Sequence, residues 1–587
     1  MYKLIKFLPN TIKIKVFLAF FTSIWPAFFS LLIPSFIKQF ITLSTGTKQE
    51  FIQILVWNVK PSIAQIDFLV ICVISCALLM LIFDFLSFRL TAYAIQQSTY
   101  YMRKILFDKI LNLSKQDIDK LEYATIITRF GNDINKAADG GIFVLCKPFS
   151  NAFFSIIWGL VFSLLISPLY SISMLIMVPL LFLGSFFAIK KLFPFYRKEN
   201  VAIDKINNSS KEDINGINLI KTYNLEQKQK EKFIQKNTDL FSIGLKADRI
   251  NTVAWRFIDF AIDLGNLSVY IIFGLIAYQF SSENISLQVG NVYQFISYLA
   301  IIAGGIFTFS FNINFLFRAS ASAKRLFEIF ELKPSITLIK NNNYVENTTI
   351  KFENVYYQYP SSNKATLKNI SFEIKPNTLV GIVGRTGSGK STIVNLLLRE
   401  IQPQSGNIYI GNKNIETIDT QNYYQNVSAV FQNSMIISGT IESNVKFANP
   451  YMQTQELEEI SRLACADFID EYQLKYQQLI GQKGINLSGG QKQRLAIVQA
   501  LVKNPKILIM DDTTSALDNK TDKQLRKNVI NSYSQTTKII IAQRISSIKD
   551  ADQIIVLNDG QIDAIGTHSQ LLKESKTYFD IYKSQTE

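Results

Sequence analysis

Residues 384–391 read Gly384-Arg385-Thr386-Gly387-Ser388-Gly389-Lys390-Ser391 and decide the fold of the C-terminal half of the chain. The pattern is that of a phosphate-binding loop. In such a loop, backbone N–H groups surround phosphates, a lysine reaches the outer phosphates and a hydroxyl binds magnesium. Residues 378–383 predict a buried strand before the loop, and residues 391–399 predict a helix after it. The alternative, a glycine-rich turn without a ligand, is disfavoured by this strand–loop–helix order.

A second apolar strand is predicted at residues 507–510, and it ends in Asp511-Asp512. From residue 350 onward, short apolar runs alternate with helical patterns. This alternation implies an α/β domain with a largely parallel sheet. We predict that the domain covers residues 350–587 and follows a polar linker at residues 331–349.

A further motif, Leu487-Ser488-Gly489-Gly490-Gln491, lies between the loop and the second strand. Together, the two motifs resemble the ABC transporter ATPases, which implies ATP and Mg²⁺ as cofactors. The resemblance implies Mg²⁺ contacts from Ser391, Gln432 and Asp511. It implies nucleotide contacts from Tyr359, Gly384, Arg385, Thr386, Gly387, Ser388, Gly389, Lys390, Ser391, Thr392, Ser488, Gly489, Gly490, Gln491 and Asp518. Tyr359 matches the aromatic residue that stacks on adenine, and the alternative for it is a packed strand aromatic.

Two residues depart from the family pattern at the end of the site that faces the γ-phosphate. Asp512 stands where the family usually has a glutamate, and Gln543 stands where it usually has a histidine. The one histidine of the chain, His568, lies elsewhere and is predicted to be structural. Asp512, Gln543 and Gln432 form the predicted catalytic group. Since a general base contributes about 10²- to 10⁴-fold, we expect this site to bind ATP and hydrolyse it slowly.

The intact signature at residues 487–491 favours a heterodimer. In ABC proteins two nucleotide-binding domains face head to tail, so the signature of one chain serves the ATP site of the other. The resemblance therefore implies a bacterial heterodimeric exporter in which this half-transporter carries the degenerate site, and its partner carries glutamate, histidine and a degraded signature. A slow homodimeric exporter of lipid or peptide is one alternative. An ATP-gated channel or membrane sensor is another.

The N-terminal half has the composition of a membrane protein. Over the whole chain 48% of residues are hydrophobic and only 18% are charged. Six stretches reach the roughly 20 apolar residues that a spanning helix needs. They are residues 16–41, 66–88, 142–166, 169–189, 253–279 and 288–316. We therefore predict an all-α transmembrane domain of six helices at residues 1–330, fused to the α/β P-loop domain.

The distribution of charge predicts the topology. The connections at 89–141 and 190–252 are rich in Lys and Arg, so they, both termini and the nucleotide-binding domain are placed in the cytoplasm of a multi-pass cell-membrane protein. Residues 167–168 leave room only for a tight hairpin, and Pro26 and Pro34 predict kinks. Because the basic residues flank apolar runs, the net charge of +15 favours anionic lipid over nucleic acid.

Polar residues within the predicted membrane helices are candidate substrate contacts. Asp259, Asp263 and Asn266 recur at helical spacing in the fifth helix, and Asn312 lies in the sixth. An acidic stripe of this kind favours a small hydrophobic, cationic substrate, and multidrug export is the implied family activity. Ion pairing with Arg256 or Arg89 is the structural alternative for the aspartates. The four cysteines show no disulfide or metal-binding spacing.

Overall fold

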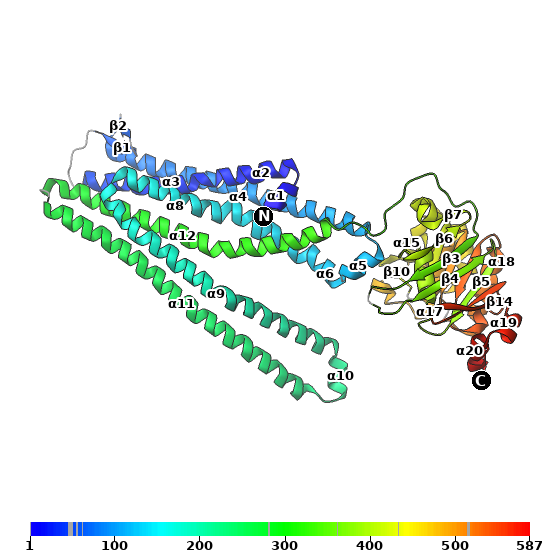
Figure 1. The fold of residues 1–587 in the computed structure, drawn as a ribbon. Coiled ribbons are helices and arrows are strands. Elements are labelled where there is room, and N and C mark those ends of the chain that lie inside the picture. The colour runs from blue at the N-terminus through cyan, green and yellow to red at the C-terminus, as the bar shows by residue number, and fades with distance from the viewer. Residues whose placement is uncertain are drawn as a thin grey trace. The chain divides into compact units, whose positions relative to one another are not determined.

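The structure, a computed structural model, describes residues 2–44, 51–54, 57–61, 63–121, 123–279, 282–360, 362–432, 434–513 and 517–586. The chain forms two compact units. A helical unit consists of Met1–Lys109 and Ala124–Leu332, and a nucleotide-binding unit consists of Ile110–Tyr123 and Lys333–Glu587. Figure 1 shows long helices in the first unit and sheets with shorter helices in the second. The short segment before Tyr123 therefore belongs to the second unit although it lies far from it in sequence.

The helical unit consists mainly of helices much longer than a bilayer requires. Within the described residues, six segments are long and apolar enough to cross a membrane: Asn10–Ser44, Gln65–Leu111, Thr125–Ile166, Pro168–Asn215, Glu226–Tyr278 and Gln288–Phe330. Five of them contain a predicted span in full, and Glu226–Tyr278 contains all but the last residue of the predicted span 253–279. The helices are α1 (Tyr2–Phe7), α2 (Asn10–Thr22), α3 (Ile24–Ser44), α4 (Gln65–Leu111), α6 (Tyr123–Thr128), α7 (Ile134–Ala137), α8 (Ser150–Ile166), α9 (Pro168–Asn215), α10 (Ile217–Thr222), α11 (Glu226–Gln279) and α12 (Ser282–Phe330).

Proline and serine set the interruptions of these helices. The first span breaks at Ser23, between α2 and α3, because the ring of Pro26 clashes with the carbonyl four residues earlier and offers no N–H. Helix α3 continues through Pro34 without an interruption. Ser167 is extended and Pro168 opens α9, so a single residue separates α8 from α9. The predicted tight hairpin is confirmed.

Close packing joins α8 to α12. A Cβ built on Gly159 of α8 would lie 2.6 Å from Cγ1 of Ile302, which is fully buried in α12. The third span also contains π-helical turns at Arg129–Asp133, Ala138–Phe143 and Leu145–Phe149. Asp133, in the first of them, pairs with Arg129 at 2.6 Å and also with Arg325 of α12. The α12 helix is thus held by close packing at Ile302 and by an ion pair at Arg325.

Two sheets organise the nucleotide-binding unit. The larger sheet has the strand order β14-β13-β5-β12-β11-β8 and is parallel except for β14. A second, antiparallel sheet has the order β4-β3-β6-β7. The strands are β3 (Ile350–Tyr357), β4 (Leu367–Ile374), β5 (Leu379–Gly384), β6 (Ser405–Ile410), β7 (Lys413–Asn414), β8 (Val427–Val430), β11 (Ile507–Asp511), β12 (Thr537–Ile541), β13 (Gln553–Asn558) and β14 (Gln561–Gly566). The predicted parallel sheet is confirmed, and the antiparallel sheet was not expected.

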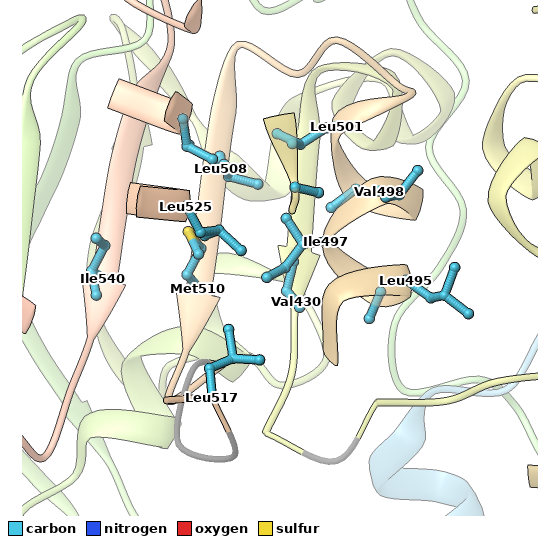
Figure 2. Packing of buried hydrophobic residues seen from close by; sticks show 14 of the residues in the cluster. Val430, Leu495, Ile497, Val498, Leu501, Leu508, Met510, Leu517, Leu525 and Ile540 are labelled. Carbon is cyan, nitrogen blue, oxygen red and sulfur yellow. The ribbon is translucent and has the colours of Figure 1, made fainter. Parts of the chain in front are cut away.

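Helices cover the larger sheet and bury its strands. They include α13 (Lys390–Leu397), α14 (Thr420–Asn426), α15 (Ile441–Val445), α16 (Thr454–Leu463), α17 (Gly489–Leu501), α18 (Asn519–Ser532), α19 (His568–Glu574) and α20 (Lys576–Thr586). Figure 2 shows Ile497 of α17 beside Val430 of β8, and Leu525 of α18 beside Met510 of β11. All residues of β5 and β12 are buried, as expected for parallel strands covered on both faces. The carboxyl ends of β5 and β11 therefore lie at the same edge of a rigid sheet.

Candidate nucleotide-binding site

Glycine geometry shapes the loop between β5 and α13. Gly387 has φ 84° and Gly389 has φ 102°, a left-handed region in which a side chain is strained. Gly389 is the residue before α13, and a Cβ there would lie 2.6 Å from Cδ2 of Leu367. The loop therefore turns sharply into the N-terminus of α13, where an anion is favoured.

Lys390 and Ser388 supply the polar interior of this loop. The ammonium of Lys390 donates hydrogen bonds to the carbonyl oxygens of Gly384, at 2.7 Å, and Arg385, at 3.0 Å. Burial lowers its pKa, although the nearby Asp511 and Asp512 oppose the shift. The hydroxyl of Ser388 is buried and has no hydrogen-bond partner among the described residues. Because a buried hydroxyl without a partner is costly, a phosphate oxygen suits this position.

The hydroxyl of Ser391 is hydrogen-bonded to the carboxylate of Asp511, at the end of β11. Burial is the main cause that raises the pKa of Asp511, and the charge of Asp512 raises it further, while Lys390 lowers it. A hydroxyl beside a carboxylate matches the oxygen ligands that Mg²⁺ prefers. The structure thus brings together two of the three residues predicted to hold the metal.

The three predicted catalytic residues meet at one carboxylate oxygen. Oδ2 of Asp512 accepts hydrogen bonds from Nε2 of Gln432, at 3.2 Å, and from Nε2 of Gln543, at 3.1 Å. Asp512 itself has φ 47°, a strained value for a residue with a side chain. Burial raises its pKa, and Arg544 and Lys390 act in the opposite direction. Gln432 is therefore a neighbour of Asp512 rather than of the Ser391–Asp511 pair in these contacts.

A fourth polar residue near this centre had no signal in the sequence. Nε2 of Gln585, near the end of α20, donates a hydrogen bond to the backbone oxygen of Gln543 at 2.7 Å. Its Oε1 accepts a hydrogen bond from the backbone N–H of Ile545 at 2.8 Å. Gln585 thus holds the segment that carries Gln543 on both sides of Arg544.

Tyr359 lies beside the loop helix. Its hydroxyl accepts a hydrogen bond from Nδ2 of Asn395 at 3.2 Å and lies 3.5 Å from Oγ1 of Thr392. Its ring meets the ring of Tyr357 edge on, at 5.0 Å between centroids. The ring is half-buried, so part of it remains accessible next to α13. This position is compatible both with packing and with stacking on a base.

The signature residues form a separate group with Asp518. Ser488 caps α17 through a reciprocal pair of hydrogen bonds with Gln491. Asp518 caps α18 by accepting a hydrogen bond from the N–H of Thr521 at 3.0 Å. The two helix starts border a cavity of about 460 Å³ that is lined by Ser488, Gly489, Gly490, Arg494, Leu517, Asp518 and Thr521. Two helix N-termini at one cavity favour an anionic ligand.

Comparisons with known proteins agree with both halves of this architecture. The family model described as "ABC transporter transmembrane region" matches residues 16–306, and the model described as "ABC transporter" matches residues 367–515. The chain is 34% identical over 502 residues to an uncharacterized ABC transporter ATP-binding protein, YfiB, of Bacillus subtilis. That alignment covers 84% of this chain and 85% of the relative. The chain belongs to the ABC transporter family.

Other relatives of this ABC transporter are similar over comparable lengths. A putative ABC transporter ATP-binding protein, MG014 of Mycoplasma genitalium, is 31% identical over 535 residues, which cover 87% of this chain and 85% of that protein. A solved bacterial Atm1-family ABC exporter with ATP bound superposes with a TM-score of 0.77 at 21% identity and covers 99% of each chain. This chain is therefore a membrane protein with the exporter fold, and its ATPase domain couples ATP hydrolysis to transport.

The candidate substrate residues of this transporter lie on exposed or half-buried surface. The Asp259 carboxylate is 3.5 Å from a guanidinium nitrogen of Arg256, and the two side chains are 53% and 82% exposed. Asp263 is exposed and Asn266 is half-buried. Nδ2 of Asn312 donates to its own helix at the oxygen of Thr308. Residues of α9, α11 and α12 line a half-open cavity of about 590 Å³, but none of the four candidates lines it.

Proposed function

We propose that this chain is the degenerate-site half of a heterodimeric ABC exporter. The observation that carries the proposal is that both Gln432 and Gln543 donate to one oxygen of Asp512. An aspartate withdraws the carboxylate by one methylene from the place that a glutamate would reach. The two amide donors also occupy the carboxylate oxygen that a general base would use to accept a proton from water. A carboxylate held in this way is poorly placed to activate water.

Nucleotide binding requires less of the site than hydrolysis does. The loop N–H groups, Lys390 and the buried hydroxyl of Ser388 support phosphate binding. Ser391 and Asp511 are suited to hold Mg²⁺, with Gln432 as a further ligand, and Tyr359 is suited to stack on adenine. The magnesium ion would neutralise the phosphate charge in this site. We therefore expect this site to hold Mg²⁺-ATP over many cycles of the partner's site.

The signature group supports a role at the partner's site. Ser488, Gly489, Gly490 and Gln491 are arranged around a helix N-terminus, and Asp518 borders the same cavity. A second nucleotide-binding domain would present its ATP to this cavity. Helix α10 and the residue after it support a partner chain as well. Ile217 and Leu219 of α10 and the following Tyr223 are 47%, 60% and 67% exposed at the turn between α9 and α11. Such apolar side chains suit an interface.

The proposed cycle is alternating access in the cell membrane. The basic connections place both termini and the nucleotide-binding unit in the cytoplasm. Binding of ATP closes the paired nucleotide-binding domains and switches the membrane helices from an inward-open to an outward-open arrangement. Hydrolysis at the partner's site returns them to the inward-open arrangement. The transported substrate is a hydrophobic or amphiphilic molecule, because the half-open cavity of the helical unit is mainly apolar.

ATPase activity of the purified chain tests the proposal, alone and co-expressed with a candidate partner half-transporter. We expect slow turnover alone, and faster turnover with the partner. Asp512→Glu combined with Gln543→His is expected to raise the turnover of the chain alone by about 10²-fold, within the range of general-base effects. The exposed pair Asp550→Glu with Gln524→His makes the same chemical changes outside the site and is the control.

Three outcomes would contradict the proposal. Rapid turnover and transport by the unmodified chain alone would establish a competent homodimer. Ion current without turnover would establish an ATP-gated channel. Unchanged slow turnover in the doubly substituted chain would place the defect outside Asp512 and Gln543.

A further inference from the structure

The half-open cavity of the helical unit has aromatic walls. It is formed by α9, α11 and α12, and its volume of about 590 Å³ is in the range of small-molecule sites. Trp255 of α11 contacts Phe307 of α12 at 4.5 Å between ring centroids. Phe307, Phe311 and Phe315 continue the aromatic surface along α12, with centroid distances of 6.2 and 5.7 Å. One side of the cavity thus suits a hydrocarbon or aromatic body.

The charged residues of the cavity are all positive. Arg197 of α9 and Arg318 of α12 line it, and its described lining contains no aspartate or glutamate. Neither guanidinium makes an ion pair within the part of the chain that the structure describes. Two unpaired guanidinium groups beside an apolar wall create a strong preference for an anion with two or more oxygens.

A neighbouring cavity between α9 and α11 extends this positive charge. It has a volume of about 640 Å³ and shares Phe193, Arg197 and Val201 with the first cavity. Its remaining charged lining residues are Lys198, Lys205, Lys236 and Asp239. With Arg197 it therefore carries four basic groups and one acidic group. An anion that approaches Arg197 from this side meets a favourable field along its path.

The position of the arginines along the helices matches the polarity of a bilayer. Trp255, Phe307, Phe311 and Phe315 lie inside the predicted spans 253–279 and 288–316. Arg197 lies beyond the predicted span 169–189, and Arg318 lies just beyond 288–316. The aromatic wall thus runs from Phe307, inside the predicted span, to Trp255 and Phe315 at the span ends. The guanidinium groups lie beyond the spans, on the headgroup side, where arginine is well tolerated.

We propose that this cavity binds an anionic amphiphile. The phosphate, sulfonate or carboxylate headgroup is held by Arg197 and Arg318, and the hydrocarbon body packs against Trp255 and the phenylalanines of α12. The inference rests on the proposed export function, of which it names the substrate class. It differs from the cationic substrate that the Asp259 and Asp263 stripe suggests, because those aspartates do not line the cavity.

Trp255 allows binding to be measured directly. In a chain with Trp25, Trp57 and Trp158 replaced by phenylalanine, Trp255 is the sole tryptophan. The protein is placed in phosphatidylcholine nanodiscs without ATP. The fluorescence of Trp255 is then titrated with an alkyl phosphate that carries a doxyl spin label at mid-chain. An alkyl trimethylammonium with the same chain and label is titrated in parallel.

We expect the labelled phosphate to quench Trp255 at about tenfold lower membrane concentration than the labelled ammonium does, since charge-assisted hydrogen bonds hold it. Arg197→Gln with Arg318→Gln should abolish this difference. Arg197→Lys with Arg318→Lys should retain part of it, because the charge remains and the paired geometry is lost. The matched control, Lys190→Gln with Lys324→Gln, removes one charge from each of the same two helices outside the cavity and should change nothing.

Equal quenching by the two labels, or an unchanged preference in the double glutamine variant, would overturn the proposal. Helical content by circular dichroism and a single gel-filtration peak, both unchanged from the parent chain, show that the helical unit of a variant is folded. Nanodiscs with phosphatidylglycerol distinguish two sources of the ligand: competition indicates a bilayer lipid, and its absence indicates an amphiphile that arrives from solution. Because the measurement needs no ATP turnover and no partner chain, its failure is distinguishable from failure of the heterodimer proposal.

Discussion

Folding and ligand binding favour opposite protonation states of two adjacent aspartates at the end of β11. Burial raises the pKa of both Asp511 and Asp512, and the charge of Asp512 raises that of Asp511 further. Their ionised forms are therefore disfavoured in the folded chain. A magnesium ion and the ammonium of Lys390 favour the same ionised forms. Metal binding and carboxylate ionisation are thus linked in this site.

Substitution of Asp511 by asparagine separates these effects. A raised folded pKa means that the aspartate's contribution to stability is present at low pH and is lost as pH rises from the ordinary value of about 3.9 through the raised value. Asp511→Asn is therefore expected to increase the melting temperature of the ligand-free chain at neutral pH and to weaken the stabilisation given by Mg²⁺-ATP. Thermal unfolding at several pH values, with and without Mg²⁺-ATP, measures both. The exposed Asp550→Asn is the control, and a lower melting temperature for Asp511→Asn at neutral pH would contradict the argument.

A substitution of Gln585 can weaken the hydrogen bonds that hold residues 543–545 without changing a residue predicted to contact the nucleotide. Gln585→Ala removes the hydrogen bonds to the oxygen of Gln543 and from the N–H of Ile545. A hydrogen bond contributes about 0.5–1.5 kcal/mol net, so amide exchange at Ile545 should accelerate by roughly tenfold. Hydrogen exchange measured by NMR or mass spectrometry reports this rate. Ser584→Ala, which removes only a bond within α20 to Ile581, should leave the rate unchanged.

The sequence predicted the local part of the site and missed its long-range part. The loop at residues 384–391 is recognisable because its glycine and lysine spacing determines the backbone directly. The predicted residues Gln432, Asp512 and Gln543 are brought together by parallel strands, which the alternation of strands and helices already implied. Gln585 is 42 residues from Gln543 and lies on an exposed helix end, so no periodicity distinguishes it from a solvated glutamine.

At the scale of elements, the short helix α5 (Lys115–Leu121) belongs to the nucleotide-binding unit. Lys115 forms an ion pair with Glu400 at 2.8 Å. Asp117 is 4% exposed and accepts hydrogen bonds from the N–H of Ser335, at 2.9 Å, and from the hydroxyl of Ser114, at 2.8 Å. These bonds lower the pKa of Asp117 against the effect of its burial. The helix is therefore fixed by a buried carboxylate rather than by an apolar face.

This type of contact explains what the sequence did not predict. The sequence predicted only that residues 89–141 form a cytoplasmic connection, and it gave no signal for the contacts of α5 with Ser335 and Glu400. The polar helix α5 has no apolar stripe, and an aspartate is assigned to solvent unless its partners are known. The six spans were predictable because an apolar run of that length indicates a membrane-spanning helix. The antiparallel sheet was not predicted, because its strands are short and only every second residue or so is buried.

Asp117→Ala is expected to detach α5. The change leaves the N–H and hydroxyl of Ser335 without a partner, so we expect α5 to lose about 1–3 kcal/mol of local stability. In the proposed exporter, ATP turnover should continue while substrate stimulation of turnover falls. The exposed Asp119→Ala on the same helix is the control. Unaltered substrate stimulation in Asp117→Ala would contradict this prediction.

At the scale of the whole molecule, helix α10 presents apolar surface at the turn between α9 and α11 (Figure 1). Leu219 of α10 and Tyr223, the residue after the helix, are 60% and 67% exposed, and α9 and α11 alone leave them uncovered. Apolar side chains at the end of two polar helix segments suit a second chain better than solvent. The sequence predicted a dimer from the signature motif, and this surface indicates where a partner would be contacted.

Leu219→Ala with Tyr223→Ala tests that surface. Because both side chains are exposed, the fold and ATP binding of the isolated chain should be unaffected. Assembly with the partner, measured by co-purification, and partner-stimulated ATPase activity should both fall, by about tenfold for the loss of two interface side chains. Leu338→Ala with Tyr344→Ala removes the same residue types from exposed positions outside α10. Full assembly of the α10 variant would contradict the proposed contact.

The environment of His568 makes the chain suitable for magnetic resonance. His568 is the one histidine of the sequence, and its Nδ1 lies 2.7 Å from the hydroxyl of the buried Tyr578 on α20. The same helix carries Gln585, which contacts the segment of Gln543. In an untagged chain that contains isotope-labelled histidine, one imidazole signal would therefore report the position of α20 relative to His568. Nucleotide-driven movement of that segment would become visible in a single resonance, without any added probe.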